Sequence, residues 1–390
     1  MLKTDQADRL VRLRAELKRL GVDGVLVPRA DAHQGEYVPA SAQRLAWLTG
    51  FTGSAGLAIV LAERAALFVD GRYTLQAQDQ VDAGLYAHRH ISEQPATEWI
   101  AANLPKGAVL GYDPWLHTPG ELERYRTAAE RAGGSMRALA ANPIDAIWTD
   151  RPGPPLAPVV PHDLRFAGKA AAEKRREVAA ALAKDAIDAA VLTAPDSIAW
   201  LLNIRGGDVP HTPLPLSFAI LHGDARVELF IDRRKLASGT EAHLGPEVTI
   251  AEPDALGPAL DRLGAAKRRV LADPAMSAVW VFDRLAAAGA RVHRAADPCQ
   301  LPKACKNAVE LAGTRAAHRR DGAALTRFLA WLARAASNGA LSEIAASDEL
   351  EKFRRGGENF RDLSFPTISG AGANGAIVHY HATPRTERRL

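Results

Sequence analysis

The sequence contains few cysteines, no long apolar run and no large excess of either charge. Two cysteines, Cys299 and Cys305, are too few for a disulfide framework or a four-cysteine zinc site, which favours a reducing, cytoplasmic location. No apolar run approaches the ~18 residues that cross a bilayer, and the N-terminus carries no secretory signal, so we expect no membrane partner. The 49 basic and 45 acidic residues are interleaved without a basic stripe, so we expect no nucleic-acid partner.

The overall composition is that of an ordinary globular protein, and the sequence pattern predicts alternating helices and strands. Its 390 residues, 47% hydrophobic and 24% charged, predict two or three domains. Leucines at helical spacing predict an amphipathic helix over residues 5–20. Short apolar runs at 25–27, 58–61 and 67–69 predict buried strands, and this alternation is typical of an α/β fold.

The pattern of the first 150 residues recurs later in the chain. Three pairs of landmarks follow in the same order, between 153 and 165 residues apart: Asp23 and Asp188, Trp47 and Trp200, and Asp70 and Asp232. In this pattern a helix is followed by the first aspartate, a strand that carries the tryptophan, and a strand that ends at the second aspartate. We therefore predict that residues 1–150 and 160–300 share one fold with one strand order, through duplication. The alternative is two unrelated α/β domains that share common dipeptides.

Composition divides the chain into three parts. The proline-rich run 150–158 is typical of a stiff linker, and after Lys303 the sequence changes from alternating elements to long helices. A helix is predicted over 306–336 and a second one over 342–355, with serine as its N-cap, before a β-rich run at 376–382. The last part has too few residues for a substantial core of its own. The predicted domains are 1–156, 157–303 and 304–390.

Two glycine-rich runs resemble nucleotide-binding loops but lack residues that such loops need. Residues 370–375 match G-x-G-x-x-G, but a strand-like run follows where a dinucleotide site needs a helix, so a turn is favoured. Residues 50–56 lack the Lys-Ser/Thr pair of a P-loop, and Thr52 occupies the first glycine position of a nucleophile elbow. They are interpreted as a tight turn between strands. Asp70 and Arg72 are interpreted as an exposed ion pair in a turn.

His379 and His381 are the most informative polar residues. Two residues apart on a predicted strand, they would share one face with Ile377, opposite Val378 and Tyr380. Two imidazoles on one face could chelate a metal, serve another active-site role or remain surface residues, and the residues alone leave all three interpretations open.

Taken together, these motifs resemble one family across the whole chain. The sequence is similar to the N-terminal two thirds of the long, three-domain cytosolic Xaa-Pro aminopeptidases (aminopeptidase P), which are pita-bread metallopeptidases with creatinase-like N-terminal domains. The similar stretches stand in the family's order: 31–37 (DAHQGEY), 50–56 (GFTGSAG), 70–73 (DGRY), 147–152 (IWTDRP), 198–206 (IAWLLNIRG), Lys306-Asn307, 362–369 (DLSFPTIS) and 374–380 (NGAIVHY).

The resemblance implies two tandem creatinase-like α/β domains followed by the truncated start of a pita-bread α+β catalytic domain. It implies a metalloexopeptidase that releases the N-terminal residue from peptides with proline in second position. In the complete enzyme two divalent metal ions, usually manganese, would bridge the attacking hydroxide, and the family usually forms a homodimer.

The resemblance also implies that this chain lacks the metal ligands. In the family the ligand-bearing segments follow the stretch that ends at Tyr380, and here only ten residues follow it. We therefore expect no metal ion in residues 1–390 and no activity from this chain alone. His379 matches the family's catalytic, substrate-contacting histidine and is the predicted site residue, whereas the resemblance assigns nothing to His381. The alternative function is a non-catalytic binding module built on the same fold.

Overall fold

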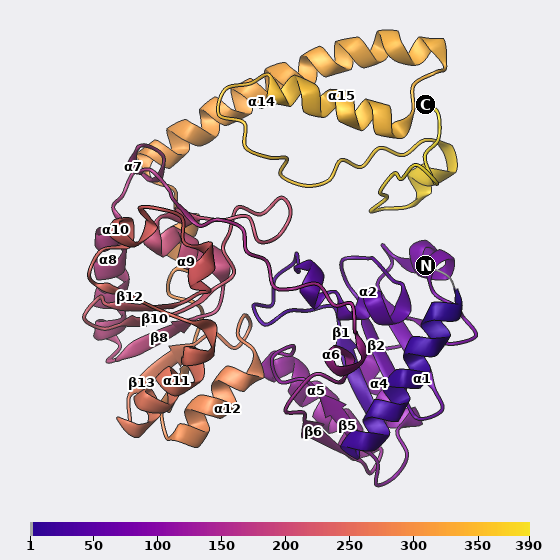
Figure 1. The fold of residues 1–390 in the computed structure, drawn as a ribbon, viewed down its shortest axis with the longest axis vertical. Coiled ribbons are helices and arrows are strands. Elements are labelled where there is room, and N and C mark those ends of the chain that lie inside the picture. The colour runs from indigo at the N-terminus through magenta and orange to yellow at the C-terminus, as the bar shows by residue number, and fades with distance from the viewer. Residues whose placement is uncertain (1–2) are drawn as a thin grey trace.

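The computed structural model describes residues 3–390. Its first domain is built around a six-stranded mixed sheet (Figure 1). The strands are β1 (Gly24–Pro28), β2 (Leu57–Leu61), β3 (Ala65–Val69), β4 (Ala87–His90), β5 (Val109–Tyr112) and β6 (Ser135–Ala138). Their order across the sheet is β4-β3-β2-β1-β5-β6, with β1 antiparallel to β2 and parallel to β5. The strands predicted at 25–27, 58–61 and 67–69 are confirmed as β1, β2 and β3.

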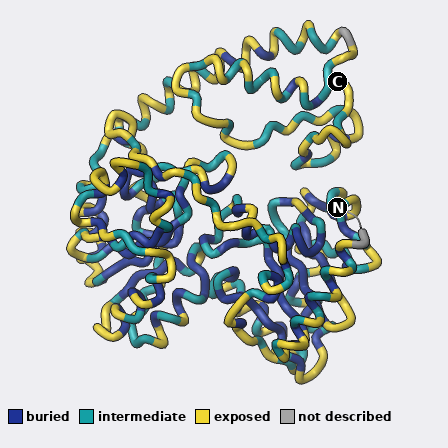
Figure 2. Tube along the Cα trace, viewed as in Figure 1, coloured by how far each residue is buried: buried dark blue, intermediate teal, exposed yellow. Residues whose placement is uncertain are grey.

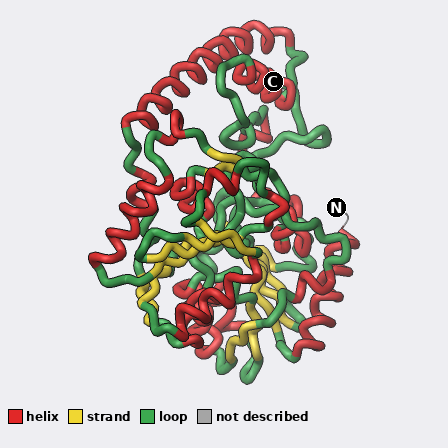
Figure 3. The backbone as a smooth tube through the Cα atoms, turned by 60° about the vertical axis from the view of Figure 1, so that its left-hand side comes forward, coloured by secondary structure: helices red, strands yellow, loops and turns green. Residues whose placement is uncertain are grey.

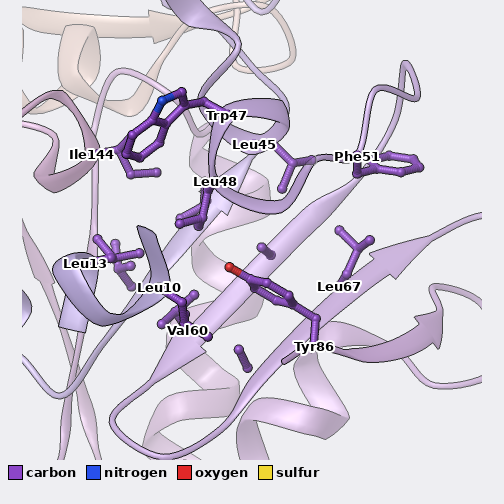
Figure 4. Close-up of a cluster of buried hydrophobic side chains, with 14 of the residues drawn as sticks. Leu10, Leu13, Leu45, Trp47, Leu48, Phe51, Val60, Leu67, Tyr86 and Ile144 are labelled. Atoms are coloured by element: carbon purple, nitrogen blue, oxygen red, sulfur yellow. The ribbon is translucent and has the colours of Figure 1, made fainter. Parts of the chain in front are cut away.

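Helices cover both faces of this sheet. They are α1 (Lys3–Leu20), α2 (Arg44–Thr49), α3 (Thr74–Gln80), α4 (Ala96–Asn103), α5 (Pro119–Arg131) and α6 (Pro143–Ile147). Side chains alternate along each strand, so Leu67 lies in the core beside α1 while Phe68 lies in the core beside α4 and α5. Figure 4 shows the first of these cores, which also contains Leu13, Trp47 and Ile144. The predicted N-terminal helix is confirmed by α1.

The second domain repeats this arrangement. Its strands are β8 (Ala189–Leu192), β10 (Phe218–His222), β11 (Val227–Phe230), β12 (Val248–Ala251), β13 (Arg269–Ala272) and β14 (Arg291–Arg294). Their order, β12-β11-β10-β8-β13-β14, matches the first sheet strand for strand and in relative direction. Helices cover both faces: α8 (Ala171–Lys184) and α9 (Pro195–Leu202) lie on one, and α11 (Leu256–Ala265) and α12 (Val279–Ala288) lie on the other. The predicted common strand order of the two halves is therefore confirmed.

Local contacts are repeated as well. The carboxylate of Asp23 accepts a hydrogen bond from the N–H of Val109 at 2.7 Å, and the carboxylate of Asp188 accepts one from the N–H of Arg269 at the same distance. In each domain this aspartate precedes the first strand and joins it to the parallel strand beside it. The repeated aspartates Asp23 and Asp188 thus have the same structural role in both copies.

The tryptophans of the repeat lie in helices, so the prediction that they lie in strands is wrong. Trp47 is in α2 and Trp200 is in α9. Both helices end at a residue in the left-handed region, Gly50 with a φ of 79° and Asn203 with a φ of 50°. The apolar runs around the tryptophans are as short as a strand, and periodicity does not separate a buried helix of this length from a strand.

A linker, several short elements and a helical hairpin complete the chain. Residues 150–158 form neither helix nor strand, as expected for a proline-rich linker. The short elements are β7 (Val160–Pro161), α7 (Leu164–Ala167), β9 (Ile204–Arg205), α10 (Thr240–Leu244) and α13 (Gln300–Ala304). The hairpin consists of α14 (Ala308–Ala335) and α15 (Glu343–Arg355). The predicted N-cap of α15 is confirmed, because the Ser342 side chain accepts a hydrogen bond from the N–H of Ala345.

The third region buries little apolar surface. Beyond residue 305, the buried apolar side chains among the described residues are Ala324, Phe328, Ala346 and Tyr380. Figure 2 shows the hairpin and the segment after it mainly as exposed and intermediate surface, in contrast with the two sheets. This agrees with the prediction that the third region has too few residues for a substantial core. Within residues 3–390, no helix combines the length and the apolar character that crossing a membrane requires.

The C-terminal segment contains no strand, so the strand predicted at 376–382 is wrong. The segment is loop apart from a 3-10 turn at Gly372–Ala376 (Figure 3). A strand needs a neighbouring strand for its N–H and C=O groups, and no strand within residues 3–390 pairs with this segment. The turn predicted at 370–375 is confirmed, whereas residues 50–56 connect α2 to β2 and do not join two strands.

Candidate active site

His379 lies against the first domain. It follows the 3-10 turn of the C-terminal segment, and its imidazole stacks on the ring of Tyr73, with centroids 5.5 Å apart and planes 20° apart. Tyr73 is the residue before α3 and is only 1% exposed. In Figure 1 the C-terminal segment descends from the hairpin toward the first domain. Two segments far apart in the sequence therefore meet at this pair of rings.

The glycine-rich loop at 50–56 holds Tyr73 in place. The ring of Phe51 meets the Tyr73 ring edge-on with centroids 5.7 Å apart, and the hydroxyls of Ser54 and Tyr73 form a hydrogen bond. A Cβ at Gly53 would lie 2.2 Å from the Phe51 ring and 2.8 Å from the Tyr73 ring, so this close approach requires glycine. The loop thus packs around an aromatic ring.

The ion pair predicted at Asp70 and Arg72 is confirmed, and it lies beside this contact. Arg72 donates two hydrogen bonds to the carboxylate of Asp70, at 3.0 and 2.7 Å, and its side chain remains 45% exposed. The hydrogen bonds from Arg72 lower the pKa of Asp70. The guanidinium also lies 5.1 Å from the centre of the Tyr73 ring. A cation and the imidazole of His379 therefore contact the same ring.

Two further histidines, His211 and His381, lie close to the segment that carries His379. His211, in the loop between β9 and β10, interacts through Nδ1 with the carbonyl oxygen of Leu363 at 3.2 Å. The pKa of His381 is lowered, first by partial loss of solvent and then by the neighbouring His379 and His211. Three imidazoles, one from the second domain and two from the C-terminal segment, therefore share one electrostatic environment.

A buried ion pair fixes the loop that carries His211. The side chains of Asp208 and Lys235 form this pair and are 0% and 4% exposed. The carboxylate of Asp208 also accepts a hydrogen bond from the N–H of Leu216 at 2.6 Å, and Lys235 donates one to the carbonyl oxygen of Leu216 at 2.8 Å. Both ends of the loop are therefore attached to one buried lysine.

The placement of the histidines differs from the sequence prediction. Because the segment is not a strand, His379 and His381 do not share one face of a sheet with Tyr380 on the other. Tyr380 is buried, His379 is half-buried and His381 is exposed. Sequence reasoning also missed Tyr73, which directly follows the predicted ion pair, and His211, which no sequence signal singles out.

The described residues do not by themselves fit a two-metal centre. In residues 3–390 no three histidine, cysteine, aspartate or glutamate side chains are arranged to hold a metal ion, and this includes the histidines around Tyr73.

Three regions of the chain match known protein families. Residues 9–140 and 150–310 each match a family described as the Creatinase/Prolidase N-terminal domain, in agreement with the duplicated fold. Residues 312–390 match Metallopeptidase family M24. The chain therefore combines two regions that match creatinase/prolidase N-terminal domains with a third region that matches metallopeptidase family M24.

Over almost its whole length, the chain is similar to aminopeptidase P proteins. It is 38% identical to the probable Xaa-Pro aminopeptidase P of Paracoccidioides brasiliensis (strain Pb18), over 98% of this chain and 64% of the relative. Identity is also 38% to the protein of that name from Coccidioides posadasii (strain C735), over 98% of this chain and 60% of the relative. The crystal structure of an X-prolyl aminopeptidase from Caenorhabditis elegans, described as a cytosolic enzyme with a di-nuclear active site, superposes with a TM-score of 0.91 at 30% identity. That match covers 98% of this chain and 65% of the Caenorhabditis elegans chain, so this chain spans 60 to 65% of these three proteins.

Proposed function

We propose that the complete protein is an Xaa-Pro aminopeptidase, which releases the N-terminal residue from peptides with proline in second position. The observation that carries this proposal is the contact between His379 and Tyr73, because it seats an imidazole on a buried ring of the first domain. The similarity to enzymes of that name supports the same activity. X-Pro peptides are the proposed substrates, and the 390-residue chain alone is expected to be inactive.

His379 is the proposed catalytic and substrate-contacting residue. Hydrolysis of an X-Pro bond places negative charge on the carbonyl oxygen and requires a proton for the leaving proline nitrogen. An imidazole held in one orientation can donate a hydrogen bond as that charge develops. Stacking on Tyr73 supports this role. The face of the imidazole packs on the Tyr73 ring, so both ring nitrogens remain at the edge of the imidazole, where they can form hydrogen bonds.

Two divalent metal ions, proposed to be manganese, would supply the activated water in the complete enzyme. The di-nuclear active site named for the Caenorhabditis elegans enzyme supports two ions but does not identify the metal. In residues 3–390 no group of side chains matches such a centre. A cytoplasmic homodimer is likewise proposed for the complete protein.

The proposed domain boundaries lie after residues 156 and 303. The first falls in the linker, which has neither helix nor strand. The second falls at the end of the short helix α13, just before Asn307 caps α14. Residues 304–390 would then contribute the hairpin and the segment that carries His379.

A peptide-cleavage assay tests the proposal against the alternative of a binding module. The complete protein with manganese should release the first residue from an X-Pro peptide and leave an X-Ala peptide of equal length intact. Binding of the X-Pro peptide without cleavage would contradict the proposal and support a non-catalytic module on the same fold.

A further inference from the structure

Glu343, the first residue of α15, is a fully buried carboxylate at the centre of a hydrogen-bond network. Its side chain is 0% exposed, and its oxygens accept hydrogen bonds from four groups of the C-terminal segment. These donors are the N–H of Ala371 at 2.5 Å, Nδ2 of Asn374 at 3.0 Å, the hydroxyl of Tyr380 at 2.8 Å and the N–H of Arg388 at 3.0 Å.

The four donors lie on both sides of His379 in the sequence. Tyr380 is its direct neighbour and is 5% exposed, so the hydroxyl contact with Glu343 fixes the backbone beside the imidazole. Asn374 adds further contacts, because its Nδ2 also lies 2.9 Å from the Tyr380 hydroxyl oxygen and 2.9 Å from the carbonyl oxygen of Thr386. The carboxylate therefore holds this segment together with the backbone hydrogen bonds that join residues 341–343 to Arg388 and Leu390.

The network depends on the negative charge of Glu343. Burial by itself raises the pKa of this carboxyl, but the hydrogen bonds from Ala371, Asn374, Tyr380 and Arg388 outweigh burial and lower the pKa. A carboxylate offers only acceptors, and all four partners are donors, whereas an amide in its place would turn an N–H₂ group toward some of them. Glu343→Gln keeps the volume and breaks this match.

We propose that Glu343 is the positioning residue for His379: its buried carboxylate sets the path of residues 371–388 so that the imidazole stacks on Tyr73. This assigns a role to a residue that touches neither Tyr73 nor the imidazole. Only the link between the position of His379 and peptide cleavage rests on the proposed function.

NMR of the 390-residue chain tests the positioning directly. In Glu343→Gln, the His379 ring signals should lose the ring-current shift caused by Tyr73, and the amides of Ala371 and Arg388 should exchange at least ~10-fold faster because their acceptor is impaired. Glu351→Gln is the matched control, since Glu351 pairs with Arg355 on the exposed side of the same helix. It should leave both readouts unchanged. Wild-type His379 signals and wild-type amide exchange in Glu343→Gln would overturn the proposal.

A second variant covers the case in which Glu343→Gln does not fold. Tyr380→Phe removes one donor to the carboxylate and changes no charge, so it should shift the His379 signals in the same direction by a smaller amount. Unchanged His379 signals in this variant would then overturn the proposal.

Activity of the complete protein separates this proposal from the proposed function. Glu343→Gln should lower kcat for an X-Pro peptide ~10- to 100-fold, because small displacements of a catalytic group cost this much, with a smaller change in KM. A wild-type protein that cleaves no X-Pro peptide would contradict the proposed function, while the NMR comparison would still decide the role of Glu343.

Discussion

Ring pairs contributed by different parts of the chain are among the contacts that join the domains. Tyr73 stacks on His379, and at the junction of the two sheet domains His33 stacks on Phe218 with centroids 4.3 Å apart. The sequence shows each of these residues but not its partner, because a contact between distant segments leaves no periodic signal. The resemblance to aminopeptidase P singled out His379 as a site residue, and it included Tyr73 in the stretch 70–73 without giving it a role.

Gly53→Ala should lower the stability of the first domain. The new methyl group would lie within 2.2 Å of the Phe51 ring and 2.8 Å of the Tyr73 ring, and such overpacking costs about 1–3 kcal/mol. Thermal unfolding measures the loss. Gly120→Ala is the control, because a Cβ there meets nothing within 4 Å and alanine suits the helix α5, so its melting temperature should stay equal or rise. Equal melting temperatures for Gly53→Ala and wild type would contradict the packing described for this loop.

The contact between the two sheet domains should weaken in acid through His33. Burial lowers the pKa of this imidazole from its ordinary value of 6.5, and Nδ1 lies 3.2 Å from the carbonyl oxygen of Thr193 in the second domain. As the pH falls below 6.5, the unfolded chain gains a proton that the folded chain does not, so the free energy of unfolding decreases.

The variant His33→Gln isolates this effect, because glutamine keeps a hydrogen-bond donor and does not titrate. The loss of melting temperature between about pH 7.5 and pH 5.5 should be smaller in His33→Gln than in wild type. The same pH dependence in both proteins would show that His33 does not contribute.

Two helices with local signals were predicted correctly, and the strand at 376–382, which depends on a partner, was not. The amphipathic spacing of α1 and the serine cap of α15 are encoded within a few residues, and both are present in the structure. The strand predicted at 376–382 needed an adjacent strand, which residues 3–390 do not provide. Residues 376–382 therefore lie in a loop. The Glu343 carboxylate accepts hydrogen bonds from some N–H and O–H groups of this C-terminal segment.

Asn307→Ala should loosen the start of α14 and its attachment to the second domain. The Asn307 side chain accepts hydrogen bonds from the N–H groups of Val309 and Glu310, both at 3.0 Å, and donates one to the carbonyl oxygen of Ala167 at 2.8 Å. Loss of such a cap costs about 1–2 kcal/mol. Hydrogen exchange at Val309 and Glu310 should become faster. In the control Thr118→Ala, which removes the cap of α5, exchange at these two amides should not change; equal exchange in Asn307→Ala and wild type would contradict the role of this cap.

At the scale of the whole molecule, duplication made the fold predictable. Two copies of one pattern predicted that both sheets share one strand order, since each copy carries the same landmarks in the same order. The site was predictable only in part, because it is assembled from three regions: Tyr73 comes from the first domain, His211 from the second and His379 from the C-terminal segment. Local sequence does not encode how these regions meet.

Steady-state kinetics of His379→Ala in the complete protein test the proposed role of His379 most directly. Losing one hydrogen-bond donor to a developing oxyanion typically costs about 10²–10³ in rate, so kcat/KM for an X-Pro peptide should fall about 100-fold. Metal content and melting temperature should stay close to wild type, and His318→Ala, on the exposed surface of α14, should keep full activity. Full activity of His379→Ala, or loss of its metal ions, would contradict the role assigned to His379.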